Sequence, residues 1–175
     1  PPTGQQLWIL SPTELVTVHR LGSLKTSHQL IIPEAEHLAD HLRQAMEISI
    51  ETQDWDRLRQ AHPAAGPALL ELHERLSRQL FAASSRSTFE LPMPPSALVS
   101  LRDLISLLGP APEPWPELLS LNHAQWASWA RLDQNLLQWT WHLQPLEPLH
   151  SLNTLLEKHP SIPVSYTHLT LPTTD

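Results

Sequence analysis

Two Glu-x-x-His pairs have the residue types and the spacing of metal ligands. Glu34 precedes His37 by three positions, and Glu147 precedes His150 in the same way. On a helix this spacing puts a carboxylate and an imidazole on one face, as in the di-iron helical bundles. Such a centre also needs carboxylates from two other helices. The chain offers three for that role: Glu71, Glu74 and Glu117.

The positions of these pairs argue against a metal centre. Glu34 stands beside Pro33 in the first turn of a predicted helix, and Glu147 lies between two prolines, whereas an inward-facing site forms at mid-helix. His37 and His41 are four residues apart, but they lack the glutamate of the His-Glu-x-x-His motif. We therefore expect no metal and no cofactor. A metal-binding helical protein or enzyme that uses the Glu-x-x-His pairs is kept as the alternative hypothesis.

Residues for nucleophilic or phosphate chemistry are missing from the sequence. None of its four glycines flanks a serine in the Gly-x-Ser-x-Gly pattern, and no glycine-rich phosphate loop is present. The chain has no cysteine, so thiol catalysis, disulfides and zinc ribbons are excluded. Its two lysines, Lys25 and Lys158, lie outside the apolar surroundings that would activate an amine. These absences favour a protein that is not an enzyme.

Tryptophans are concentrated between residues 115 and 141. Spacings of three and four connect most of the large apolar side chains there, which predicts one buried face of a helix from about 117 to 143. That face comprises Trp126, Trp129, Leu132, Leu136, Trp139 and Leu143. Trp141 falls off the face, and Trp115 lies in a proline-rich linker. Because tryptophan is enriched in binding hot spots, we predict that Trp141 and Trp115 contact a partner protein and that Trp141 is exposed.

The same spacing rule predicts helices along most of the chain. Ser11-Pro12-Thr13-Glu14 has the order of a capping box at the start of a helix over 12–21. Further helices are expected from residue 34 to a break at 52–54, around Trp55 and Leu58, over 67–82, 95–108 and 117–143, and around Leu149 to Leu156. Residues 83–95 and 109–116 are predicted linkers, and a strand is expected only near residues 29–32. The expected fold class is all-α, an irregular multi-helix bundle with Pro-rich linkers.

The composition limits the classes of partner. The 175 residues carry 11 Lys and Arg against 18 Asp and Glu, a formal net charge of -7. Nucleic-acid binding needs clustered positive charge, so a protein partner is expected and a nucleic acid is not. No apolar run approaches the ~20 residues of a membrane span. The start of the chain does not read as a signal peptide, which indicates a cytoplasmic location.

The last residues of the chain contain a distinctive run of ten residues. Residues 164–173 read Val-Ser-Tyr-Thr-His-Leu-Thr-Leu-Pro-Thr. This run resembles a translation of the transposon adapter used in sequencing libraries. The resemblance implies that residues 163–175 are a non-native tail, and we expect residues 164–175 to make no core contacts. Residues 1–162 are then expected to form a single helical domain encoded by a truncated gene.

One segment suggests a functional class. Residues 34–82 combine an amphipathic helix, the segment Gln53-Asp54-Trp55-Asp56-Arg57-Leu58, and a leucine-rich helix. This segment resembles the helical hairpin of bacterial flagellar export chaperones and related small helical adaptors. The resemblance implies an adaptor or chaperone-like role and transfers no individual functional residue. Our hypothesis from the sequence is a non-enzymatic all-α domain that offers apolar helix faces to the helices of a protein partner.

Overall fold

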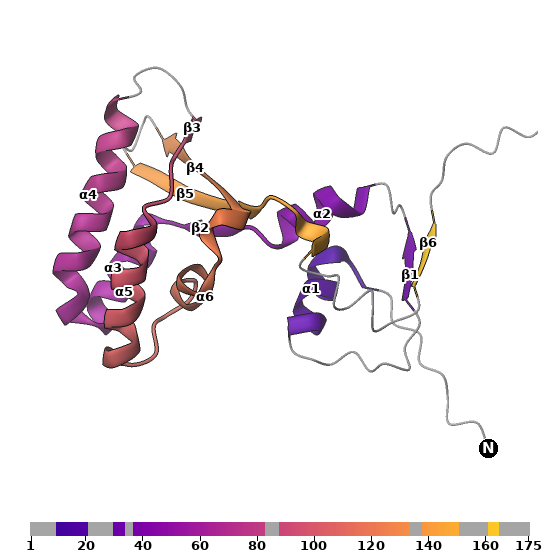
Figure 1. The fold of residues 1–175 in the computed structure, drawn as a ribbon, viewed down its shortest axis with the longest axis horizontal. Coiled ribbons are helices and arrows are strands. Elements are labelled where there is room, and N and C mark those ends of the chain that lie inside the picture. The colour runs from indigo at the N-terminus through magenta and orange to yellow at the C-terminus, as the bar shows by residue number, and fades with distance from the viewer. Residues whose placement is uncertain are drawn as a thin grey trace, which may run out of the picture. The chain divides into compact units, whose positions relative to one another are not determined.

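The fold contains two compact units, which we describe separately. A computed structural model describes residues 10–20, 30–33, 37–82, 88–133, 138–150 and 161–164. Unit 1 combines Pro1–Met46 with Glu147–Asp175, and unit 2 is Glu47–Leu146 (Figure 1).

The described part of unit 1 contains helices α1 and α2 and a small parallel sheet. Helix α1 spans Pro12–Arg20 and helix α2 spans Leu38–Ala45. Strand β1, Leu30–Pro33, pairs in parallel with strand β6, Ser161–Val164. Residues 148–150 are also helical. The strand predicted near residues 29–32 is therefore confirmed by β1.

The predicted capping box opens helix α1. The backbone N–H of Ser11 donates to the Glu14 carboxylate at 2.7 Å, and the Glu14 backbone N–H donates to the Ser11 hydroxyl at 3.3 Å. Two hydrogen bonds to the Glu14 carboxylate lower its pKa below the ordinary value. The larger effect comes from the Ser11 backbone N–H, and the smaller one from the Ser11 hydroxyl. Two backbone donors at the helix start are satisfied in this way.

Strand β6 contains the start of the run that resembles the adapter. Val164 pairs with Pro33 in the parallel sheet, where Leu30 pairs with Ser161. Residues 165–175 lie outside the described residues. The expectation that the tail makes no core contacts therefore stays a prediction.

Unit 2 is built on a four-stranded antiparallel sheet with the order β2-β5-β4-β3. Its strands are β2, Ile48–Ile50; β3, Thr88–Glu90; β4, Trp126–Asp133; and β5, Gln138–Pro145. Its helices are α3, Thr52–Ala61; α4, Gly66–Ala82; α5, Pro95–Leu108; and α6, Trp115–Ser120. Short 3-10 turns occur at Pro63–Ala65 and His123–Gln125. The four helices lie on one side of the sheet (Figure 1).

The predicted all-α fold class is wrong, because unit 2 contains this sheet. The helix expected over 117–143 is replaced from residue 126 onward by the hairpin of β4 and β5. A spacing of four puts two side chains on one face of a helix and also on one face of a strand, so Trp139 and Leu143 fit both periods. Trp126 and Trp129, three apart, lie on opposite faces of β4: Trp126 packs against the core, and Trp129 does not.

Several helices end where the pattern predicts. Helices α1, α4 and α5 agree with the predicted segments 12–21, 67–82 and 95–108, and α3 carries Trp55 and Leu58 as expected. The helix expected from residue 34 is described only over Leu38–Ala45, and β2 follows it. The segment that resembles a chaperone hairpin is thus divided between the two units, and its functional meaning stays a prediction.

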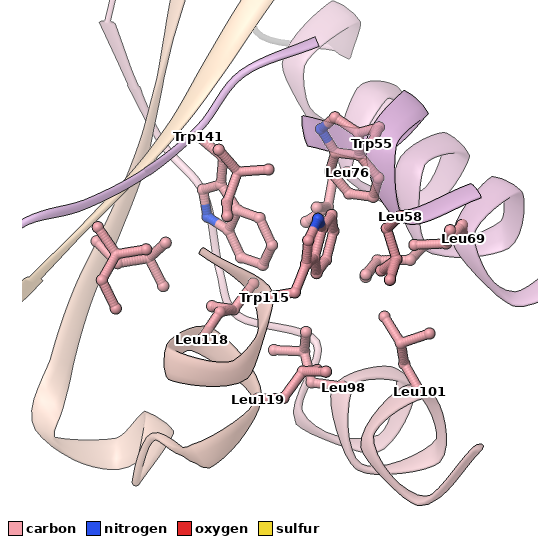
Figure 2. Close-up of a cluster of buried hydrophobic side chains, with 14 of the residues drawn as sticks. Trp55, Leu58, Leu69, Leu76, Leu98, Leu101, Trp115, Leu118, Leu119 and Trp141 are labelled. Atoms are coloured by element: carbon pink, nitrogen blue, oxygen red, sulfur yellow. The ribbon is translucent and has the colours of Figure 1, made fainter. Parts of the chain in front are cut away.

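Tryptophans occupy the middle of the unit 2 core (Figure 2). The indole of Trp55 contacts that of Trp115 edge-on at 5.0 Å between ring centroids, and it stacks on Trp141 at 6.4 Å. Leucines of the helices surround them: Leu58, Leu69, Leu72, Leu76, Leu98, Leu101, Leu118 and Leu119. The two fully buried indoles have acceptors for their N–H groups, since Trp115 donates to the Asp54 carbonyl at 2.9 Å and Trp141 to the Ser128 hydroxyl at 2.7 Å. The core therefore unites helices α3, α4, α5 and α6 with the sheet.

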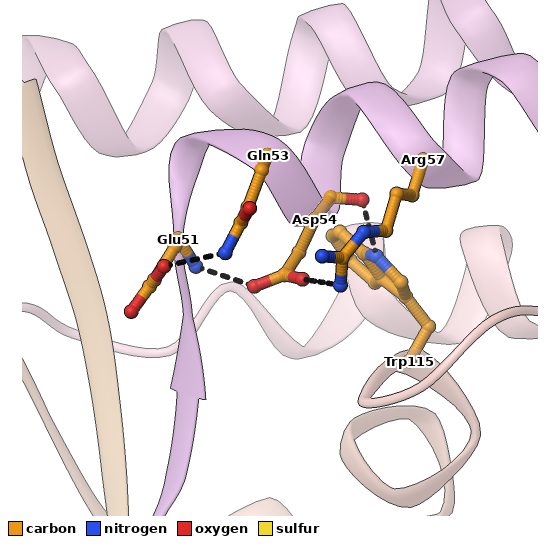
Figure 3. A network of polar contacts seen from close by, with 5 residues as sticks. All are labelled: Glu51, Gln53, Asp54, Arg57 and Trp115. Atoms are coloured by element: carbon orange, nitrogen blue, oxygen red, sulfur yellow. Dashed lines mark hydrogen bonds and ion pairs between the residues drawn. The ribbon is translucent and has the colours of Figure 1, made fainter.

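A polar network fixes the start of helix α3 (Figure 3). The backbone N–H of Glu51 donates to the Asp54 carboxylate at 2.8 Å, and the Asp54 backbone N–H donates to the Glu51 carbonyl at 2.9 Å in return. Arg57 pairs with the same carboxylate at 3.1 Å. Trp115 reaches the Asp54 carbonyl, so the network also ties α6 to α3. The buried carboxylate of Asp54 therefore has two hydrogen-bond donors, the Glu51 backbone N–H and the Arg57 guanidinium.

Replacing Asp54 tests this network. We expect Asp54→Ala to lower the free energy of unfolding by about 1–2 kcal/mol, because it removes one half of a capping box. The matched control is Asp56→Ala, whose exposed pair with Arg59 at 2.7 Å has the same spacing and should cost about 0.5 kcal/mol or less. Urea unfolding of both variants measures the difference. Equal losses would show that the cap contributes nothing beyond a surface ion pair.

Candidate functional site

The predicted metal ligands are not assembled in the structure. His37, Glu147 and His150 are exposed, and Glu34 lies outside the described residues. The rings of His37 and His41 are 6.2 Å apart between centroids. Of the helper carboxylates, Glu71 and Glu74 are exposed on α4, and Glu117 is part-buried on α6. Within the described ranges, no group of three or more His, Asp or Glu side chains could hold a metal ion.

The two tryptophans predicted to bind a partner lie in the core. Trp141 and Trp115 each have 0% of their surface exposed, so the prediction that Trp141 is exposed is wrong. On β5, alternate residues share a face, and Trp141 points inward together with Trp139 and Leu143. The alternation of Trp139, Trp141 and Leu143 with polar residues was the signal for this strand. Neither side chain offers a surface on which a partner could dock.

The other face of the sheet carries polar side chains. We call it the polar sheet face, and it is the face turned away from Trp139, Trp141 and Leu143. Its members are Glu47, Ser49, Thr88, Glu90, Ala127, Trp129, Arg131, Asp133, Gln138, Thr140, His142 and Gln144. None of these side chains belongs to the buried class. The sequence pattern did not reveal this face, because residues 126–143 were predicted to belong to one helix and residues 83–95, which contain β3, to a linker.

One row of residues crosses all four strands of this face. Ser49 on β2 pairs with His142 on β5, His142 pairs with Trp129 on β4, and Trp129 pairs with Glu90 on β3. The rings of His142 and Trp129 are stacked, with 5.5 Å between centroids and 11° between planes. Cross-strand neighbours on one face stand about 5 Å apart. Trp129 therefore has His142 on one side and Glu90 on the other.

Hydrogen bonds hold His142 in place. Its Nδ1 lies 2.7 Å from a carboxylate oxygen of Glu47 and 3.1 Å from the Ser49 hydroxyl. The Ser49 hydroxyl also donates to Glu47 at 3.2 Å, and the Gln144 amide donates to the second oxygen of Glu47. The imidazole that stacks on Trp129 thus has two hydrogen-bond partners, Glu47 and Ser49, and Gln144 in turn holds the Glu47 carboxylate.

This arrangement of Ser49, His142 and Glu47 does not fit a hydrolytic triad. In a triad the histidine meets the serine at one ring nitrogen and the carboxylate at the other. Here both groups meet Nδ1. Nε2 of His142 has no hydrogen-bond partner among the described residues. The cluster can orient a surface aromatic ring, but it does not position a nucleophile.

A second histidine lies beside the tryptophans of the core. His73 on α4 contacts Trp55 edge-on at 5.1 Å and Trp139 at 5.0 Å between ring centroids. Its Nδ1 lies 3.4 Å from the Ser77 hydroxyl. Burial lowers the pKa of His73 from the ordinary 6.5, and the neighbouring Glu74 charge opposes this effect.

His73 should make stability depend on pH. Because its pKa is lowered in the folded state, the unfolded chain binds the proton more readily. His73 therefore lowers the free energy of unfolding as the pH falls through 6.5, until the pH is below the pKa of the folded state. His73→Phe should make the decline between about pH 7 and pH 5 shallower. Urea unfolding at several pH values, with His41→Gln as the control, measures this slope, and an unchanged slope in His73→Phe would contradict the assignment.

Unit 1 has one depression of note in its described part. It measures about 290 Å³ and is open to solvent between α1 and α2. Its lining residues are Pro12, Thr13, His41, Gln44 and Ala45. It is shallow and has one titratable side chain, whereas binding sites for small molecules enclose most of the ligand and converge several polar groups on it.

Comparisons with known proteins do not assign this chain to a family. The sequence matches no protein-family model, and no curated protein is significantly similar to it. Among the described helices, none combines the length and the apolar character that a membrane crossing needs. The candidate site is therefore defined by its geometry alone.

Proposed function

We propose that this chain is a non-enzymatic protein-interaction domain that contacts its partner through the polar sheet face. The observation that carries the proposal is a partly exposed tryptophan, Trp129, at the centre of a sheet face that lies opposite the helices of unit 2. Tryptophan is the side chain most enriched among residues that dominate binding energy.

The position of Trp129 suits a binding role. Its ring is stacked on His142, and His142 is hydrogen-bonded to Glu47. A ring that is already ordered loses little conformational entropy when a partner covers it, which favours affinity. The polar groups around the ring resemble the mixed composition of protein interfaces, where an aromatic centre has a polar rim.

The helices do not provide an equivalent surface. The apolar faces of α4 and α5 pack into the core through Leu72, Leu76, Leu98 and Leu101, so the apolar helix faces that we expected to be offered to a partner are occupied. Exposed leucines remain on these helices, Leu107 being 84% exposed, but single exposed apolar side chains are common on protein surfaces.

A peptide-display selection tests the proposal. A library of random peptides is selected on the full chain, and the enriched peptides are assayed against Trp129→Ser and against the matched helix-surface variant Leu107→Ser. We expect binding to be lost with Trp129→Ser and retained with Leu107→Ser. The melting temperatures of both variants show whether they are folded. Enriched peptides that bind folded Trp129→Ser as well as the parent chain would overturn the proposal.

A further inference from the structure

We propose that the polar sheet face recognises an arginine side chain of its protein partner, held between the ring of Trp129 and the carboxylate of Glu90. This inference rests on the proposed function and specifies the partner's chemistry. Three observations support it: the Trp129 ring, the Glu90 carboxylate that is its cross-strand neighbour, and the charge of the surrounding face.

The register creates a place for a flat cation. His142 on β5 covers one side of the Trp129 ring, with nearly parallel planes. Glu90 on β3 is the cross-strand neighbour on the other side, and its side chain is exposed. A guanidinium group that stacks on the indole side toward β3 would therefore meet the Glu90 carboxylate. A planar cation can stack on an aromatic ring and donate to a carboxylate at the same time, which the compact ammonium of lysine does less well.

The charge of the face favours a cationic ligand. Among the members of the polar sheet face, Glu47, Glu90 and Asp133 carry carboxylates, whereas Arg131 alone carries a guanidinium or ammonium group. Complementary charge also suppresses binding of acidic partners. The whole chain has a net charge of -7, so a basic segment is also attracted at longer range.

Arg131 is the competing group within the chain. It lies two residues from Trp129 on the same face and makes no ion pair or ring contact with any described residue. Its charge opposes the approach of a second cation, and its long side chain can reach Glu90 diagonally across the strands. Removing this charge should therefore strengthen arginine binding.

The test uses a short capped peptide with one arginine among glycines and serines, and the same peptide with citrulline in place of arginine. Citrulline keeps the shape and removes the charge. Isotope-labelled protein is titrated, and the indole N–H signal of Trp129 is followed by NMR. We expect the arginine peptide to shift this signal and to bind about fivefold more tightly than the citrulline peptide.

Variants separate the site from general charge effects. Glu90→Gln should weaken arginine binding about fivefold, and Arg131→Gln should strengthen it, whereas the matched acid on helix α4, Glu71→Gln, should leave it unchanged. Equal binding of the arginine and citrulline peptides, or equal effects of Glu90→Gln and Glu71→Gln, would overturn the inference. These outcomes are distinguishable from failure of the proposed function, because the display selection detects a partner that depends on Trp129 whether or not it contains arginine.

Discussion

Trp141→Ala is expected to lower the free energy of unfolding by about 3–5 kcal/mol, the range measured when buried tryptophans are truncated. Trp141 has no exposed surface, stacks on Trp55, and donates its indole N–H to Ser128. Its removal leaves a cavity where the sheet meets the helices and an unsatisfied serine hydroxyl. The loss is a large part of the ~5–15 kcal/mol that stabilises a typical domain.

The control is a tryptophan on the same sheet but on its other face. Trp129→Ala should cost only about 1 kcal/mol, because its ring is partly in water and contributes less apolar burial. Chemical unfolding monitored by circular dichroism gives both values. If Trp129→Ala costs as much as Trp141→Ala, then the polar sheet face is part of a core and is unsuitable as a binding surface.

Trp115→Ala should destabilise the chain by a similar amount, about 3–5 kcal/mol, for a different reason. Trp115 begins the short helix α6, has no exposed surface, and contacts Trp55 edge-on. Its N–H donates to the Asp54 carbonyl at the start of α3. The substitution therefore loses apolar burial and also the hydrogen bond that joins two helices.

Trp115→Phe separates these two contributions. Phenylalanine keeps most of the buried aromatic surface but cannot donate to Asp54, so we expect a loss of about 1–3 kcal/mol. The ratio of the two losses is read from urea unfolding of both variants at the same pH. If Trp115→Phe is as stable as the parent chain, the hydrogen bond to Asp54 contributes nothing and the role of Trp115 is packing alone.

Local patterns predicted helices α1, α3, α4 and α5, whereas α6 begins inside the predicted linker 109–116. The spacing of Leu98, Leu101 and Ile105 predicted α5, and the order of Ser11 and Glu14 predicted the cap of α1. These signals are local, since a helix forms its hydrogen bonds within one segment. The observed bounds of α4 and α5 agree closely with the predicted segments for the same reason.

The strands of unit 2 could not be predicted in the same way. A strand is stabilised by partners that are distant in sequence, so its preference depends on context. Trp139 and Leu143 satisfy the helical and the extended period equally, and only the alternation that includes Trp141 distinguishes a strand from a helix there. The three-residue strands β2 and β3 are too short to show any period.

The candidate site was hidden for a related reason. Glu47 and His142 are 95 positions apart in sequence and meet only because β2 pairs with β5. Sequence spacing can indicate only residues that are close along the chain, such as the Glu-x-x-His pairs that were considered as metal ligands. Their residues in the described part of the structure, His37, Glu147 and His150, are exposed side chains.

The sheet order also has a consequence for the synthesis of the chain. Strand β5 lies between β2 and β4, so β2 has no partner in its sheet until β5 is present. Residues 48–50 leave the ribosome long before residues 138–145, and helices α3, α4 and α5 can form in the meantime because their hydrogen bonds are local. The tryptophan core then closes in a late step, when Trp139 and Trp141 arrive together on one strand. A nascent chain that stops short of residue 138 would expose the apolar faces of these helices and would need protection from aggregation.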